Sequence, residues 1–304
     1  MSGWRRPWLS WCMMLAAGGL LAWVAFWEEP RSTSLTALSV ETPAWPAGVA
    51  PVRVVFLSDI HVDGAHMPRE RVARIAETAS LLDPDIVLLG GDFIGGMGFG
   101  AGPSGSARIR RSAAENSRDE RALAALGAMR ARYGVFAAIG NHDCWWDCQR
   151  MRAILEAAGV TVLSNEAREI VRPGQASVWI AGVADADIQS PDFERVHAQI
   201  PEGAAALLVM HDAGLFDWEV NRFPVQFAGH THAGQVRFPF IGAPARMSRH
   251  TEDTADGFTI EGGRIFIVSR GMGTVGLPVR FGAAPQIMLV RVQRGVAAAV
   301  RKLS

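Results

Sequence analysis

The sequence lacks a net charge and has few cysteines. Its 304 residues hold 30 Lys and Arg against 30 Asp and Glu, which gives a formal net charge of +0. This balance removes the usual electrostatic basis for binding duplex nucleic acid, so we expect no nucleic-acid partner. Three cysteines cannot form the disulfide framework of a small secreted domain. No repeat of roughly 20 to 50 residues is visible, so a solenoid is not indicated.

The composition is that of a folded protein with a sizeable core. Hydrophobic residues make up 49% of the chain and charged residues 20%. A chain of this length and composition is neither disordered nor collagen-like. We therefore expect one large domain with an appendage.

The first 30 residues are predicted to be a separate unit. Residues 7–27 carry no charge, and at about 1.5 Å per residue this segment is long enough to span a membrane as a helix. Tryptophans lie toward both ends of the segment, where indole rings favour the membrane interface. These are Trp4, Trp8, Trp11, Trp23 and Trp27.

Charges flanking this segment predict its orientation. Arg5 and Arg6 precede it and Glu28 and Glu29 follow it, so the positive-inside rule places the N-terminus in the cytoplasm. No small-residue cleavage site ends the apolar run, which favours an uncleaved signal anchor over a removed signal peptide. Residues 5–9 also resemble a loose twin-arginine export signal, although the two arginines equally suit a topology signal. We predict a single-pass protein of the inner (cytoplasmic) membrane whose folded domain faces the periplasm.

The rest of the chain divides into a linker and one α/β domain. Residues 31–50 contain Pro43 and Pro46 without sustained periodicity and predict a tether, so the folded domain is expected to cover 51–304. Strand-like runs alternate with helical stretches at first, and strands dominate later. The expected strands are 52–57, 86–89, 135–139, 177–183, 206–210, 225–228, 264–268 and 286–292, with helices at 69–82, 118–132 and 151–158.

A glycine-rich segment interrupts this rhythm. Residues 95–106 hold six glycines and are followed by Arg108, Arg110 and Arg111. This composition predicts a long mobile loop, of the kind that often forms a lid beside a site.

Polar residues follow the predicted strands in a fixed order. Asp59 and His61 have i, i+2 spacing after the first strand, so their side chains emerge on the same side of an extended chain. Gly90 and Gly91 precede Asp92 after the second strand, where glycine permits a tight turn. The carboxyl ends of strands are where α/β sheets place ligand groups.

Three further motifs complete the series. Asn141, His142 and Asp143 follow the third strand, His211 follows a later one, and His230 and His232 repeat the i, i+2 spacing. A single motif of this kind is more often turn chemistry than a ligand set. Five in one order are hard to obtain by chance, and mixed nitrogen and oxygen donors without thiolates suit Mn, Fe or Zn.

This ordered series resembles the calcineurin-like metallophosphoesterases over residues 52–293. The segments 234–244 and 269–282 further resemble a membrane-anchored bacterial subgroup of phosphodiesterases, similar to the pyrophosphatases of UDP-2,3-diacylglucosamine in lipid A synthesis. The resemblance implies a four-layer α/β/β/α sandwich with a site for two divalent metal ions. It implies that Asp59, His61 and His232 hold one metal, that Asn141, His211 and His230 hold the other, and that Asp92 bridges both.

The same resemblance implies catalytic roles and a reaction. A hydroxide bridging the metals would attack phosphorus, and His142 would stabilise the phosphoryl oxygen or protonate the leaving group. Asp143 could orient His142 or could cap the following helix. Arg270 and Arg280 could grip a further phosphate, or could form surface ion pairs. The substrate expected is a phosphodiester or a lipid-linked phosphate.

Two questions stay open at the level of sequence. Cys144 and Cys148, four residues apart, could form a disulfide, bind metal or pack as free thiols. The domain could also be a metal-binding scaffold without turnover. Loss of a ligand or of His142 would mark such a scaffold, and all of these residues are present, which favours a hydrolase of phosphoric esters.

Overall fold

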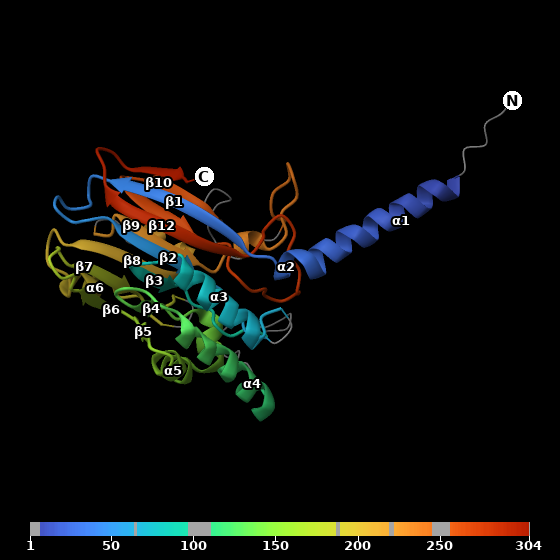
Figure 1. Ribbon diagram of the computed structural model, residues 1–304, viewed down its shortest axis with the longest axis horizontal. Helices are drawn as coiled ribbons and strands as arrows, with labels where there is room; N and C mark the ends of the chain where they lie inside the picture. Colours follow the sequence, from blue (N-terminus) through green and yellow to red (C-terminus); the bar gives the residue numbers. More distant parts are fainter. Residues whose placement is uncertain are drawn as a thin grey trace.

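The computed structural model describes residues 7–63, 66–96, 111–186, 189–218, 222–244 and 256–303. Two β-sheets pack face to face, helices cover the outer side of the first sheet, and a long helix projects from one end (Figure 1). The first sheet has seven strands in the order β13-β1-β12-β2-β3-β4-β5, and the second has six in the order β10-β11-β9-β8-β7-β6.

The first sheet is mixed. Parallel pairing joins β2 through β5, and β12 pairs antiparallel with β2. The strands are β1 (Ser34–Thr42), β2 (Val52–Leu57), β3 (Ile86–Leu89), β4 (Val135–Ala137), β5 (Val160–Val162), β12 (Gln286–Arg294) and β13 (Ala299–Lys302).

The second sheet has a parallel centre, formed by β7, β8, β9 and β11, with antiparallel strands at both edges. Its strands are β6 (Glu166–Ile170), β7 (Val178–Gly182), β8 (Ala205–Asp212), β9 (Val225–Gly229), β10 (Gly257–Glu261) and β11 (Arg264–Val268).

Buried apolar residues form three clusters: one between the two sheets and one on the outer face of each sheet. In β2, Val54 and Phe56 face the second sheet, whereas Val55 and Leu57 belong to the cluster under the helices. A strand that is buried on both faces has a nearly continuous apolar sequence, and β2 has such a sequence. The helices on the first sheet are α3 (Arg69–Leu81), α4 (Ala113–Leu123) with the 3-10 turn η2 (Ala124–Ala128), and α5 (Asn141–Ala157).

A third cluster lies on the outer face of the second sheet. There α6 (Phe193–Ala198) and the 3-10 turn η3 (Ala213–Trp218) contribute Val196, Leu215 and Phe216 to the packing. The layers therefore run helix, sheet, sheet, helix, and the predicted four-layer α/β/β/α sandwich is confirmed.

The predicted N-terminal helix is present as a continuous segment. It comprises α1 (Pro7–Trp23), a π-helical turn η1 (Val24–Glu28) and α2 (Glu29–Arg31). Residues 10–31 are long and apolar enough to cross a membrane. The arginines at positions 5 and 6, on which the predicted orientation depends, lie outside the described residues.

The predicted tether is wrong. Residues 34–42 form β1, which pairs parallel with β12 from Ser34 opposite Gln286 to Thr42 opposite Arg294, and antiparallel with β13. Leu38 and Val40 are buried in the core between the sheets. Their alternation with polar residues is a strand pattern that the neighbouring Ser, Thr and Pro residues obscured.

Other differences concern element boundaries. The helix expected over 118–132 begins earlier and ends at Leu123, where η2 takes over, and the helix expected over 151–158 begins at Asn141. The strands β5, β6, β10 and β13 were not anticipated. The glycine-rich segment predicted as a lid lies mostly outside the described residues.

The strand register places the predicted site at the anchored end of the domain. Ser34, three residues after the last residue of α2, lies opposite Gln286, whereas Phe56 near the end of β2 lies opposite Met288. The end of β2 that precedes Asp59 therefore lies beside the start of β1, close to where the anchor helix joins the domain (Figure 1).

Candidate metal centre

Seven predicted metal ligands come together where the strands of both sheets end. Loops after β2, β3 and β4 bring the first four, and the end of β8 and the loop after β9 bring the other three. All are buried except His230, which is partly exposed. The residues are Asp59, His61, Asp92, Asn141, His211, His230 and His232.

One group of these side chains consists of Asp59, His61 and His232. The Nε2 atoms of the two histidines lie 3.0 Å apart, and His232 Nε2 lies 3.4 Å from Asp59 Oδ1. One ligand atom from each of the three residues lies within 4.8 Å of the others. This group could hold a divalent cation.

A second group lies on the other side of Asp92. Its Oδ2 atom is 3.3 Å from His211 Nε2, which is 3.0 Å from both Asn141 Oδ1 and His230 Nδ1. The same Asp92 Oδ2 atom is 3.5 Å from His61 Nε2 in the first group. Asp92 therefore joins the two groups, and a carboxylate placed in this way can bind cations on both sides.

The protonation states of the first group suit a metal site. Burial, with His142 nearby, lowers the pKa of His61 to about 3. Burial and the neighbouring His61 also hold the pKa of His232 well below its ordinary value. Both rings are therefore neutral near pH 7, and a neutral imidazole has the lone pair that a metal requires.

In the second group the charge balance is different. Burial alone would lower the pKa of His211, but the carboxylate of Asp92 raises it well above the ordinary value. Burial likewise opposes ionisation of Asp92, yet His211 and His142 hold its pKa well below the usual range. An ionised buried carboxylate needs a positive partner, and a divalent cation is such a partner.

Backbone carbonyls orient two of the rings. His61 Nδ1 donates to Ile94 O at 3.2 Å, and His211 Nδ1 donates to Gly90 O at 2.7 Å. With Nδ1 as the donor, Nε2 is the atom of each ring that faces the other ligands. In His211 the carboxylate of Asp92 favours a proton on Nε2 as well, which a bound cation would displace.

The backbone around the site adopts an uncommon conformation. Left-handed φ angles occur at five of the seven ligands: 54° at Asp59, 47° at His61, 54° at Asp92, 69° at His230 and 49° at His232. Residues other than glycine avoid this region unless the surrounding structure imposes it, and such residues gather at functional sites.

Two glycines allow the loops to pack this closely. Gly91 has φ +86°, and a Cβ there would lie 2.7 Å from Gly140 N and 2.9 Å from His211 Nδ1. A Cβ at Gly229 would overlap Ser58 Oγ and Asp59 Oδ2. Both positions therefore require glycine for the ligands to meet.

His142 lies at the rim of this cluster. Its Nε2 is 4.0 Å from Asp92 Oδ2, farther than the corresponding atoms of His61 and His211. Its Nδ1 is buried and has no hydrogen-bond partner among the described residues. His142 could complete a third ligand group with His61 and Asp92, but its greater distance suits contact with a bound substrate.

Asp143 braces two loops. Its Oδ1 accepts hydrogen bonds from Phe93 N at 2.8 Å and Ile94 N at 3.1 Å, and its Oδ2 accepts one from Gly140 N at 3.0 Å. These bonds tie the loop after Asp92 to the N-terminus of α5. The helix-capping alternative therefore accounts for its contacts, and no contact with the ring of His142 is found among the described residues.

The structure does not support the phosphate-binding role expected for Arg280. This side chain is fully buried, and its guanidinium donates to Gly273 O, Ala283 O and Arg270 O. Its Nη2 also lies 3.1 Å from His232 Nδ1. The guanidinium of Arg280 therefore stabilises the loop that follows β11 and contacts the ring of His232.

Arg270 forms the ion pair that was the alternative expectation. Its Nε lies 2.7 Å from Asp256 Oδ2, and the same carboxylate binds Arg237 at 3.0 Å. Contact with a phosphate would require Arg270 to leave this pair.

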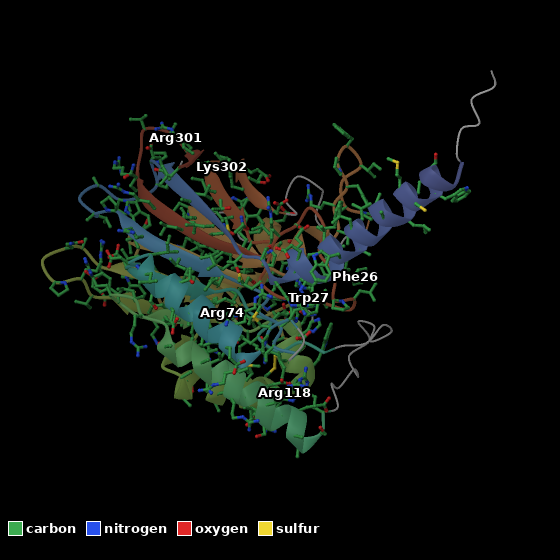
Figure 2. All side chains as sticks on the ribbon, turned by 45° about the vertical axis from the view of Figure 1, so that its right-hand side comes forward. Phe26, Trp27, Arg74, Arg118, Arg301 and Lys302 are labelled. Atoms are coloured by element: carbon green, nitrogen blue, oxygen red, sulfur yellow. A yellow bond between two sulfur atoms is a disulfide. The ribbon has the colours of Figure 1, made fainter. Side chains whose placement is uncertain are left out.

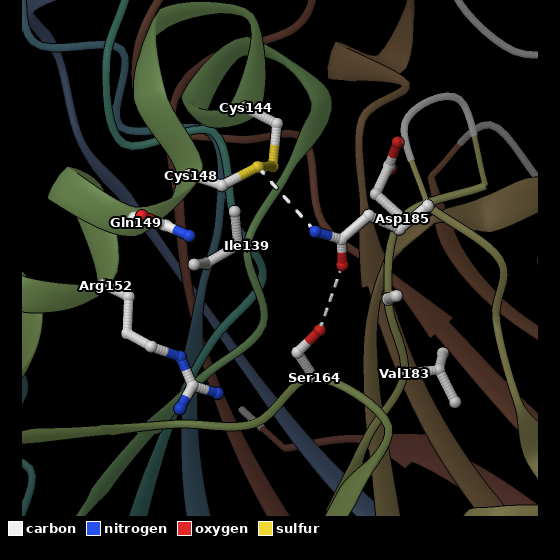
Figure 3. Close-up of a pocket in the computed structure, with 10 residues that line it drawn as sticks. Ile139, Cys144, Cys148, Gln149, Arg152, Ser164, Val183 and Asp185 are labelled. Atoms are coloured by element: carbon white, nitrogen blue, oxygen red, sulfur yellow. Dashed lines mark hydrogen bonds between the residues drawn. A yellow bond between two sulfur atoms is a disulfide. The ribbon is translucent and has the colours of Figure 1, made fainter.

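Cys144 and Cys148 form a disulfide, one of the three states left open. The backbone leaves helical geometry at Asp147, between them. Figure 3 shows the disulfide beside a pocket near Ser164 and Asp185, with a hydrogen bond of 3.9 Å from Gln189 to Cys148 Sγ. The pocket measures about 120 Å³, below the usual range for a ligand site.

The chain is similar to a known family of enzymes and to individual proteins. A family model described as Calcineurin-like phosphoesterase matches residues 52–234. The chain is 26% identical over 282 residues to an uncharacterized metallophosphoesterase, YkuE, of Bacillus subtilis (strain 168), covering 90% of this chain and 91% of that protein.

One further relative and one solved structure are also similar to this chain. A transmembrane protein with metallophosphoesterase domain from Danio rerio is 27% identical, covering 82% of this chain and 55% of that protein. The solved structure of GAP50, the anchor in the inner membrane complex of Plasmodium, has a TM-score of 0.45 at 9% identity, covering 84% of each chain. The family match includes every motif of the ligand cluster, and the chain belongs to the calcineurin-like phosphoesterases.

Proposed function

We propose that this protein is a membrane-anchored phosphodiesterase or pyrophosphatase that uses two divalent cations, drawn from Mn, Fe and Zn. The observation that carries the proposal is the position of Asp92, whose Oδ2 lies 3.5 Å from a ligand atom of the first group and 3.3 Å from one of the second. When bound, two adjacent cations lower the pKa of a water molecule and neutralise charge on phosphoryl oxygens.

The ligands divide between the two cations. Asp59, His61 and His232 would hold the first, and Asn141, His211 and His230 would hold the second, with Asp92 contributing to both. Each group offers nitrogen and oxygen donors and no thiolate, which suits hard to borderline divalent ions.

His142 is the residue that we assign to the substrate. Its ring stands next to Asp92 without being needed by either ligand group, and Trp145 packs 4.8 Å from it. From this position His142 Nε2 can hydrogen-bond a phosphoryl oxygen or give a proton to the leaving group. Asp143 acts as a positioning residue, because its contacts are with backbone N–H groups.

The substrate class follows from where the site lies. The metal centre is at the end of the domain that carries the anchor, so a phosphate attached to a lipid is the leading candidate. Among such molecules UDP-2,3-diacylglucosamine has the pyrophosphate that this chemistry would split.

The orientation in the membrane bears on that choice. The flanking charges predict a domain facing outward, and a disulfide at Cys144–Cys148 supports this because disulfides persist in oxidising compartments. UDP-linked precursors are made in the cytoplasm. An outward-facing domain in the inner membrane would therefore act on an envelope lipid or an exported phosphodiester.

The proposal is tested with the full-length chain in lipid nanodiscs, stripped of metal and reloaded with Mn, Fe, Zn or Mg. The substrates are bis-p-nitrophenyl phosphate, p-nitrophenyl phosphate and UDP-2,3-diacylglucosamine. We expect metal-dependent turnover of a diester or of the lipid nucleotide, with two metals per chain. Asp92→Ala should lose both metal and turnover, whereas Asp147→Ala, at an exposed position, should lose neither.

Two results would count against this function. Full metal occupancy in Asp92→Ala would contradict a bridging role. Two bound metals without turnover of any phosphoester would favour the alternative, a metal-binding scaffold on the same fold.

A further inference from the structure

A turn of four consecutive apolar residues projects into solvent at the anchored end of the domain. These are Phe238, Pro239, Phe240 and Ile241, and neighbouring Leu277 is also exposed. Phe240 is 108% exposed and Ile241 74%. A compact group of large apolar side chains on the surface indicates a site of interaction with a protein or a membrane.

The turn is held in place by its own hydrogen bonds. Phe238 N donates to Gly242 O at 2.9 Å, and Gly242 N donates to Phe238 O at 3.0 Å. Phe240 has a left-handed φ of 67°, which is uncommon for a bulky residue. The turn therefore presents its aromatic side chain outward at a conformational cost that packing inside the domain does not offset.

Backbone hydrogen bonds connect the base of this turn to the anchor helix. Arg237 N donates to Phe281 O at 2.7 Å, and Phe281 N donates to Gln235 O at 2.9 Å. The residue before Phe281, Arg280, donates its backbone N–H to Ala25 O at 2.9 Å. The turn is thus fixed relative to the last turns of the membrane-spanning helix.

The anchor contributes a second attachment at the same place. The carboxylate of Glu29 accepts hydrogen bonds from Gly282 N at 3.0 Å and Ala283 N at 2.7 Å. Sequence reasoning treated Glu29 only as a flanking charge and missed this role. Two loops of the domain, 235–242 and 275–283, therefore move together with the end of the anchor.

Residues at the end of the anchor helix indicate where the membrane surface lies. The guanidinium of Arg31 lies 3.7 Å from the centre of the Trp27 ring, and Trp23 stacks on Trp27 at 5.5 Å. Tryptophan is enriched at the membrane–water interface, and an arginine at a helix end can extend its guanidinium to water. Figure 2 shows Phe26 and Trp27 where the helix meets the domain, and the loop coloured orange projects from that same end in Figures 1 and 2.

We propose that the turn 238–241, together with Leu277, enters the interface of the bilayer that the anchor crosses. The occupant of this apolar surface is lipid, because the covalent anchor already brings this end of the domain to the bilayer. The turn also carries no charge, and aromatic and aliphatic side chains of this kind favour the interfacial region.

Contact of the turn 238–241 with the bilayer would also affect the position of the metal centre. Gln235 links the two loops, since its side chain donates to Val275 O at 3.1 Å and Leu277 O at 3.3 Å. The first loop follows His232 directly, and the second carries Arg280, which contacts His232. Contact at the turn and at the anchor would fix the height and tilt of the ligand cluster above the lipid. This consequence rests on the proposed function, whereas the contact itself does not.

The contact is tested by measuring depth in the full-length protein in nanodiscs. In a Cys12→Ser background, Ile241→Cys carries an environment-sensitive nitrobenzoxadiazole label. The matched control is Val296→Cys, whose native side chain is also exposed, at 102% against 74% for Ile241. It lies in the turn after β12, and because β12 runs parallel to β1 this turn is at the end of the sheet away from the anchor.

We expect the label at position 241 to shift its emission to shorter wavelength and to be quenched by lipids with a nitroxide near the headgroup. The label at 296 should show neither effect. Water-like, unquenched emission at both positions would overturn the proposal.

A second measurement avoids the label. In Phe240→Ser/Ile241→Ser, turnover of a phosphodiester lipid in the disc should fall, by up to about 10²-fold, the loss that a misplacement of about 1 Å can cause. Turnover of soluble bis-p-nitrophenyl phosphate should be unchanged. An equal loss on both substrates, or no loss on either, would refute the effect of the contact on the metal centre. If no phosphoester is turned over but the label is quenched, the proposed function fails and the membrane contact stands.

Discussion

Replacing Asp143 by alanine separates a positioning role from a catalytic one. The carboxylate accepts three backbone hydrogen bonds, from Phe93, Ile94 and Gly140, and the side chain is 0% exposed. Asp143→Ala leaves three buried N–H groups without acceptors. It also releases the loop that carries Asp92 from the start of α5.

The size of the effect follows from these three bonds. A buried donor left without a partner costs about 1 to 3 kcal/mol, and the low end applies where water can enter the cavity. Three such donors give a loss of about 3 kcal/mol in the free energy of unfolding. For a domain of this size each kcal/mol corresponds to about 2 to 4 °C, so the melting temperature should fall by roughly 6 to 12 °C.

The assay is thermal unfolding of the full-length protein in detergent, with metal content measured on the same samples. Asp147→Ala is the matched control, because this exposed carboxylate accepts a single bond, from Arg150 N at 3.0 Å. We expect it to change the melting temperature by no more than about 2 °C. The pH dependence of turnover in metal-saturated Asp143→Ala should match that of the wild type. An unchanged melting temperature together with a shifted pH profile would refute the positioning role.

Three further predictions concern the ligand cluster. His142→Ala should cut turnover by roughly 10² to 10⁴ with metal content intact, and unchanged turnover would remove His142 from the mechanism. Gly229→Ala should lose metal, because a Cβ there overlaps Asp59 Oδ2; Gly18→Ala in the anchor helix, where a Cβ meets nothing within 4 Å, should not. Chelation should lower the melting temperature of the wild type, since ligand at about 100 times its dissociation constant adds about 2.7 kcal/mol of stability. Asp92→Ala should not respond to chelation, and a wild-type response in that variant would contradict its place between the two ligand groups.

The order of polar motifs predicted which side chains come together, because each motif follows a buried strand. Parallel strands of one sheet end at a common edge, which brings Asp59 and Asp92 together. Asp59 and His232 follow strands of different sheets, β2 and β9, so their meeting also requires the two sheets to pack with these edges side by side. The α/β class followed from the alternation of strands and helices, whereas the four-layer sandwich was implied by the family resemblance.

Arg280 shows where sequence reasoning fails. An arginine among glycines near a phosphoesterase site suggests phosphate binding, and only the packing of residues 270–283 reveals that carbonyl oxygens surround it. The prediction of a tether where β1 lies fails for another reason. Half of the residues of β1 are polar because only one face is fully buried, and its parallel partner β12 lies some 250 residues away in sequence.

The correction at β1 changes what the anchor does. A free segment of 20 residues could extend up to about 70 Å and would let the domain sample substrates well away from the membrane. Instead only Ser32 and Thr33 separate α2 from β1, and Ser32 N is bonded to Glu28 O and Glu29 O. Arg71 of α3 adds bonds to Pro30 O and Ser32 O. With this junction held on several sides, the candidate metal centre would stay near the bilayer that we propose the anchor crosses. A substrate would then have to come to the membrane or already belong to it, and this is the reason for proposing a phosphate on a lipid over a freely diffusing phosphoester.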